Sequence, residues 1–86
     1  MRELERIYKA VANRRRLAIL KYLKQNGEAP VGEIAHEINL SFKATSKHLG
    51  KLDECNILER EQRSSQMFYR LASSQKPPVR HVITLL

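Results

Sequence analysis

The feature that most limits how this chain can fold is a pair of short amphipathic segments that follow one another almost without a gap. In the first, apolar residues recur at the i, i+3, i+4 and i+7 spacing of one helical face, and they are Val31, Ile34, Ala35 and Ile38. In the second, Ser41 is placed to cap a helix whose inward stripe is Ala44, Thr45, Leu49 and Leu52. Two short helices joined by a turn of a few residues predict a helix-turn-helix.

After Asn56 the spacing of apolar residues changes from that of a helix to the alternation of a strand. Two extended runs, 57–62 and 66–71, are joined across residues 63–65. The inward side chains of the second run are expected to be Met67, Tyr69 and Leu71. Because the joining residues lack the Asn-Gly signal of a tight turn, we expect a longer, flexible tip. A β-hairpin placed here predicts a winged helix-turn-helix.

Two further helices are expected before this motif. The first carries an apolar stripe of Leu4, Ile7, Tyr8 and Val11. The second spans 14–26, since Asn13 suits an N-cap and Asn26-Gly27 supply a C-terminal stop that needs positive φ. The expected fold is therefore mainly α with a small β-hairpin: four helices, a two-stranded wing and a short C-terminal helix or tail.

Residues 1–72 are expected to form one folded unit, followed by a C-terminal tail over residues 73–86. A polar stretch begins near Ser73 and runs into Pro77-Pro78. Beyond the prolines, one helical face is apolar, with Val79, Val82, Ile83 and Leu86. So short a helix is marginal in isolation, and we expect this face to pack against a partner.

A chain of 86 residues suffices for one small domain and is too short for a second core. Sixteen Lys and Arg against nine Asp and Glu give a net charge of +7, which favours polyanionic partners, nucleic acid first. No stretch approaches the apolar length of a membrane span, so no membrane partner is expected. Nothing at the N-terminus resembles a secretory signal, and Cys55 is the single cysteine; the expected location is cytoplasmic.

An enzyme is not expected. No nucleophile, base and orienting acid occur in a recognisable arrangement, and the three glycines of the chain form no phosphate-binding loop. A domain of this size also has little room for an enclosed pocket. We therefore expect no cofactor, and no small-molecule substrate is evident.

One side of the second helix-turn-helix segment, opposite its core stripe, is basic and polar. It consists of Lys43, Ser46, Lys47, Gly50 and Lys51, and no acid precedes Asp53. Lysines attract phosphates, Ser46 can donate or accept at a base edge, and Gly50 would let the wall of a groove approach closely. Taken alone, a lysine-rich face is more often a solvated surface. Its position between a short helix and a hairpin favours nucleic acid.

The run Arg14-Arg15-Arg16 opens a helix, although cations there oppose the helix dipole. Two interpretations remain open: contact with phosphate, or pairing with acids elsewhere in the domain. The acids considered are Glu28, Glu33 and Glu37. Arg16 adjoins the core stripe and is expected to be the structural member of the run.

Two arginines of the hairpin, Arg60 and Arg63, could reach an adjacent minor groove or the DNA backbone. A solvated hairpin is the alternative. Phe68 falls on the opposite strand face from Tyr69, so we expect it to cover the hairpin or a partner subunit rather than to stack on a base.

Three stretches form a pattern whose combined spacing is more specific than any one piece. They are A-V-A-N-R-R-R-L-A-I-L from Ala10 to Leu20, V-G-E-I-A from Val31 to Ala35 with L-S-F-K-A-T-S-K-H-L from Leu40 to Leu49, and F-Y-R-L from Phe68 to Leu71. This pattern resembles the ArsR/SmtB family of winged helix-turn-helix repressors over about residues 4–72.

The resemblance implies a homodimer in which the first helix and a C-terminal helix pair across a two-fold axis. Two copies of the second helix-turn-helix segment would then meet successive major grooves. Interface residues implied are Leu4, Ile7, Tyr8, Val11, Val79, Val82, Ile83 and Leu86. DNA contacts implied are Ser46, Lys47 and His48, with Lys43 and Thr45 adjacent. A buried or phosphate-facing structural role is the alternative for His48.

The chain also departs from the family. Paired cysteines and the acidic and histidine clusters that let many members sense metals are missing, and His36, His48 and His81 lack a paired ligand spacing, so no metal site is expected. Cys55 is expected to be a small buried hydrophobe. Asn39 and Asn56 stand where the family often uses glycine, and Pro30 replaces the usual hydroxyl cap.

These observations predict a homodimeric, sequence-specific DNA-binding transcriptional regulator, a repressor that occludes a promoter and places residues 42–54 in the major groove. The alternative is a winged-helix module that binds protein, or an RNA-binding adaptor, with only non-specific DNA affinity. A regulator should keep a strong preference for one DNA site at physiological salt, whereas such a module should not.

Overall fold

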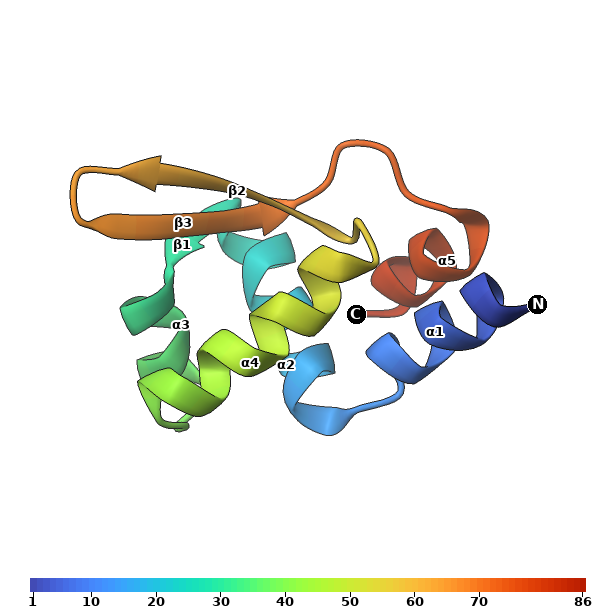
Figure 1. The fold of residues 1–86 in the computed structure, drawn as a ribbon, viewed down its shortest axis with the longest axis horizontal. Helices are drawn as coiled ribbons and strands as arrows, with labels where there is room; N and C mark the ends of the chain where they lie inside the picture. The colour runs from blue at the N-terminus through green and yellow to red at the C-terminus, as the bar shows by residue number, and fades with distance from the viewer.

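Five helices and a three-stranded antiparallel sheet make up the fold, and the computed structural model describes every residue from 1 to 86 (Figure 1). In chain order the elements are α1 (Arg2–Val11), α2 (Arg14–Asn26), β1 (Glu28–Pro30), α3 (Val31–Glu37), α4 (Phe42–Glu54), β2 (Leu58–Arg63), β3 (Gln66–Leu71) and α5 (Pro77–Leu85). The predicted winged helix-turn-helix is confirmed, and the tail forms a helix. None of these helices combines the length and the apolar character needed to cross a membrane.

Side-chain caps set the starts of the two longest helices. The Asn13 side chain accepts a hydrogen bond from the Arg16 amide at 3.1 Å, and the Ser41 hydroxyl accepts one from the Ala44 amide at 3.1 Å. Gly27 ends α2 with φ of 85°, a conformation that a side chain would strain. The predicted bounds of α2 and the predicted cap of α4 are therefore confirmed.

The turns on either side of α4 use asparagine in the left-handed region. Asn39 has φ of 55° and Asn56 has φ of 60°. Asparagine tolerates this region better than most residues, so these turns form without glycine. Pro30 precedes α3 in an extended conformation and provides no side-chain cap, yet the helix begins at the next residue.

The wing contains a strand that the sequence pattern did not predict. The order in the sheet is β1-β3-β2, and Ala29 of β1 lies opposite Tyr69 of β3. Because β1 has three residues and ends in Pro30, it is too short to show strand periodicity. The expected two-stranded wing is thus corrected to a three-stranded sheet.

The tip of the hairpin is also tighter than expected. Arg63 pairs with Gln66, which leaves only Ser64 and Ser65 in the turn. Ser64 has φ of 53°, and a positive φ at the first central residue is what the usual turns of two-residue hairpins need. The prediction of a longer tip was wrong because Ser64 adopts the positive φ for which the Asn-Gly signal had been sought.

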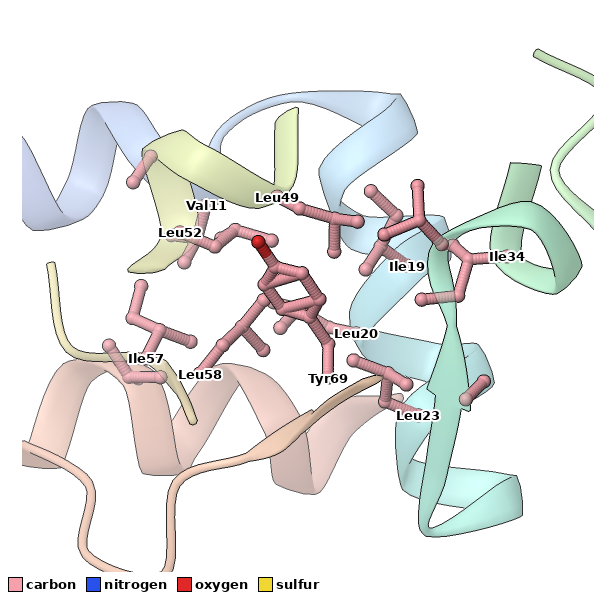
Figure 2. Packing of buried hydrophobic residues seen from close by; sticks show 14 of the residues in the cluster. Val11, Ile19, Leu20, Leu23, Ile34, Leu49, Leu52, Ile57, Leu58 and Tyr69 are labelled. Carbon is pink, nitrogen blue, oxygen red and sulfur yellow. The ribbon is translucent and has the colours of Figure 1, made fainter. Parts of the chain in front are cut away.

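Side chains from every helix and strand meet in one apolar interior, and Figure 2 shows Leu20, Leu52 and Tyr69 converging there. Each fully buried leucine contributes about 1.5–3 kcal/mol relative to exposure. Three residues expected at a dimer interface belong to this interior instead: Ile7, Val11 and Val79 are 3%, 5% and 2% exposed. They are covered because α1 and α5 pack on each other and on α2 within one protomer.

The α1–α5 pair forms one end of the molecule, and the hairpin tip and the start of α4 lie toward the other (Figure 1). Lys24 Nζ donates a hydrogen bond to the Ile83 carbonyl at 2.9 Å, and Glu3 forms an ion pair with Lys76. These contacts attach α5 to α1 and α2. The helix-turn-helix is left at the opposite end with its outer face open.

Candidate nucleic-acid interface

The outer face of α4 carries three exposed lysines, Lys43, Lys47 and Lys51. No hydrogen bond or ion pair holds them, whereas Lys9 pairs with Glu5 and Lys76 with Glu3. Ser46 and Gly50 lie half-buried between the lysines on the same face. The positive charge of this face is therefore free to act on a ligand outside the chain.

Thr45 does not belong to this face. Its side chain is fully buried beside the core stripe of α4, and its Oγ1 atom has no hydrogen-bond partner. The expectation that Thr45 lies next to the DNA contacts was wrong because position 45 falls on the helical face of Leu49 and Leu52.

The three arginines at the start of α2 have different surroundings. Arg15 Nη1 donates to the Ile38 carbonyl at 3.1 Å, and Arg16 Nη2 donates to the Lys9 carbonyl at 3.3 Å, while Arg14 is exposed. None of them forms an ion pair, so pairing with Glu28, Glu33 or Glu37 was the wrong alternative. Glu33 instead accepts a hydrogen bond from the Tyr22 hydroxyl, and this bond is the largest of the effects that raise the pKa of Tyr22 to about 12.

A groove lies between the start of α2 and the outer face of α4. It is lined by Arg16, Lys47, His48, Gly50, Lys51 and Glu54. Burial, together with the charges of Arg16 and Arg15, lowers the pKa of His48 below its usual range. His48 is therefore neutral at neutral pH, and the positive charge of the groove comes from its arginine and lysines.

The wing carries compensated charge. Arg63 binds Glu28 through two hydrogen bonds of 2.6 and 2.9 Å and also binds Glu61 at 3.1 Å. These contacts lower the pKa of both carboxyl groups and raise the pKa of Arg63. The Arg63 guanidinium also lies 4.5 Å from the centre of the Phe68 ring, so Phe68 covers the hairpin. Glu28 and Glu61 thus hold the Arg63 guanidinium on the sheet, and the contact with DNA that was expected of Arg63 stays a prediction.

Arg60 is the more accessible arginine of the wing. Its Nε atom lies 3.7 Å from Asp53 Oδ2, and its side chain is 56% exposed. An exposed pair of this kind contributes at most about 1 kcal/mol, so Arg60 can exchange Asp53 for another anion. The pair also connects β2 to the C-terminal half of α4.

Phe42 is a surface residue that the sequence reasoning missed. It is the first residue of α4, directly after the Ser41 cap, and it is 62% exposed. An apolar residue outside the inward stripe of a predicted helix is the signal that could have identified it.

Two other expectations concern metal and thiol chemistry. No three His, Cys, Asp or Glu side chains lie close enough together to hold a metal ion. Cys55 caps the C-terminus of α4 and is half-buried, with its Sγ atom 3.9 Å from the Arg6 carbonyl oxygen. It packs at the edge of the core rather than within it.

A helix with an uncompensated cationic face, preceded by a short helix and followed by a three-stranded wing, defines a winged helix-turn-helix DNA-binding module. The family model described as bacterial regulatory protein, arsR family, matches residues 13–60, and the chain belongs to this family of transcriptional regulators, which are not enzymes.

Known proteins agree with this assignment. The transcriptional activator HlyU of Vibrio cholerae is 38% identical over 80 residues, which cover 93% of this chain and 70% of HlyU. The nodulation protein NolR of Rhizobium meliloti is 42% identical over 65 residues, which cover 76% of this chain and 52% of NolR. The homodimeric winged helix-turn-helix DNA-binding domain of Mb0332 from Mycobacterium bovis superimposes with a TM-score of 0.80 at 31% identity, over 96% of this chain and 73% of that one.

Proposed function

We propose that this regulator binds one DNA sequence as a homodimer, with α4 of each protomer in a major groove, and represses transcription by covering a promoter. The observation that carries the proposal is the outer face of α4, where Lys43, Lys47 and Lys51 are exposed and unpaired. The chain has a net charge of +7, and most of its ion pairs lie on the sheet or on α1. The charge available to a duplex is thereby concentrated on α4 and the start of α2.

Each residue type on this face has a distinct role toward DNA. The lysines neutralise phosphates and release counterions, which supplies affinity that is independent of sequence. Ser46 offers a hydroxyl to a base edge, and Gly50 offers no side chain at all, so the helix backbone can approach the groove there. Arg14 extends the cationic surface from α2 toward the phosphates that flank the groove.

The α1–α5 end is proposed as the surface for the second protomer. Of the five large hydrophobic residues that are exposed, all but Phe42 lie at this end: Met1, Leu4, Tyr8 and Leu85. Val82, Ile83 and Leu86 are half-buried beside them. Mb0332, a homodimer, supports the same assembly here. With a two-fold axis through this end, we expect the two copies of α4 to meet successive major grooves about one DNA turn apart, roughly 34 Å.

Repression is the simplest consequence of such binding, because a dimer that covers two successive major grooves excludes other proteins from that DNA. HlyU is named an activator, so the direction of regulation needs its own measurement. A reporter gene placed behind the selected site should be transcribed less when the protein is present. Increased transcription would overturn repression and leave DNA recognition intact.

The central experiment is selection of duplexes from random DNA by the purified chain at about 150 mM salt, an ionic strength at which exposed charges are well screened. We expect a two-fold symmetric consensus for the wild type, its loss in Lys47→Glu, and its retention in Lys21→Glu, which makes the same charge change at an exposed position of α2. A wild type that enriches no sequence would overturn the proposal and favour a protein-binding or RNA-binding module.

The dimer is tested separately with Leu85→Glu, because Leu85 is 72% exposed and its replacement removes no core contact. Sedimentation equilibrium should give a dimer for the wild type and a monomer for the variant. A wild type that stays monomeric at micromolar concentration would overturn the proposed assembly.

A further inference from the structure

We propose that Phe42 determines part of the DNA specificity by contacting the C5-methyl group of a thymine in the major groove, an inference that rests on the proposed function. Phe42 is 62% exposed, and it is the one large exposed hydrophobic residue outside the α1–α5 end. It therefore needs an explanation other than the proposed dimer surface.

The position of Phe42 is that of a base-reading residue. It is the first residue of α4, and the N-terminal residues of a recognition helix are those that meet base edges. Lys43 follows it and Ser46 lies one turn further along the same side, while the first turn contains no acid. Figure 1 shows this end of α4 projecting away from α1 and α5.

The chemistry of the side chain selects the contact. A phenyl ring neither donates nor accepts hydrogen bonds, so the polar atoms of the base edges offer it nothing. The apolar group that the major groove presents is the C5-methyl of thymine, and phenylalanine is one of the side chains suited to it. A modified cytosine with a C5-methyl group shares this chemistry, so the experiment has to separate the two bases.

The probe is the duplex that the purified wild type selects from random DNA. Replacing the relevant thymine with uracil removes one methyl group and preserves the base pair. Loss of one buried methyl contact should weaken binding about fourfold for one half-site, or about sixteenfold for both. Phe42→Ala should bind the thymine duplex more weakly by at least this factor and should no longer distinguish thymine from uracil.

Two matched variants control the measurement. Phe42→Leu keeps an apolar side chain and should retain a preference for thymine, and Lys21→Ala should retain the full wild-type preference. Because Phe42 is largely exposed, Phe42→Ala should unfold at the wild-type temperature. A further pair of duplexes carries 5-methylcytosine or cytosine at the position. Tighter binding of the 5-methylcytosine duplex would show that the methyl group is read on either base. A preference for the methyl group on thymine alone keeps the proposal as stated.

The outcomes separate this inference from the function on which it rests. A wild type that selects no sequence overturns the proposed function and this inference with it. The wild type can select a sequence and yet show the same loss of affinity as Phe42→Ala when each thymine in turn is replaced by uracil. That result overturns the role of Phe42 alone. A selected half-site without thymine has the same meaning.

Discussion

Replacing Lys47 with alanine should reduce the salt dependence of DNA binding by an amount that can be worked out beforehand. The exposed cations without an intramolecular partner on this surface are Lys43, Lys47 and Lys51 on α4 and Arg14 on α2. These four per protomer make eight in a dimer. If each contacts a phosphate, the logarithm of the affinity falls with the logarithm of the salt concentration with a slope of about −7.

Lys47→Ala removes two of these contacts from the dimer, so the slope should become about −5. Between 50 and 200 mM salt the wild type should lose roughly 20,000-fold in affinity and the variant about 2,000-fold. The difference between the two proteins should therefore be greatest at low salt and should shrink as salt is added. Because Lys47 is exposed, the variant should be as stable as the wild type.

Fluorescence anisotropy with the selected duplex measures both slopes over this range of salt. The control is Lys21→Ala, which removes the same charge from an exposed position of α2. An unchanged slope in Lys47→Ala would refute the assignment of Lys47 to a phosphate. Equal reductions in the two variants would show a general effect of net charge rather than a contact made by α4.

Three other variants examine single residues of α4. Thr45→Val removes a buried hydroxyl without a partner, so the free energy of unfolding in urea should rise by about 1 kcal/mol while DNA affinity stays constant; weaker DNA binding would return Thr45 to the interface. Gly50→Ala should raise the same free energy by about 1 kcal/mol, since the added Cβ meets nothing within 4 Å, and should weaken DNA binding; unchanged affinity would exclude close approach of the helix at Gly50. Because the pKa of His48 is lowered on folding, the unfolded chain binds a proton more readily than the folded one. The contribution of His48 to the free energy of unfolding is therefore fully present above about pH 6.5 and decreases as the pH falls below that value. His48→Gln should lose this pH dependence, and parallel pH profiles of the two proteins would contradict the assignment.

The parts of the fold that sequence reasoning predicted are those set by neighbouring residues. The Asn13 and Ser41 caps, the stop at Gly27 and the apolar stripes act within one helical turn, so their effect is visible in the sequence. The bounds of α2 and the order of α3, α4 and the hairpin followed from them. Interactions over longer distances along the chain were not visible in this way.

The site was predicted less evenly than the fold. The helical period placed Thr45 inward, whereas the motif resemblance placed it beside the DNA contacts, and the burial of Thr45 shows that the period was the better guide. The prediction that Ile7, Val11 and Val79 lie at the dimer interface was wrong for a similar reason. An apolar stripe does not reveal whether the same protomer or another one will cover it. Phe42 was missed because it offers neither charge nor hydrogen bonds.

Two features of the wing that the sequence did not show have one physical cause. The pairing of Arg63 with Glu28 was not predicted, because the nearest acid in the sequence is Glu61. The wing was predicted to have two strands because β1 is too short to show a period. Pairing of β1 with β3 brings Glu28 across 35 residues of sequence to bind the Arg63 guanidinium. The same strand that completes the sheet therefore compensates the charge of the wing. A net charge of +7 spread along the chain becomes, after folding, a compensated sheet and an uncompensated α4, and we propose that this separation directs a polyanion to the helix.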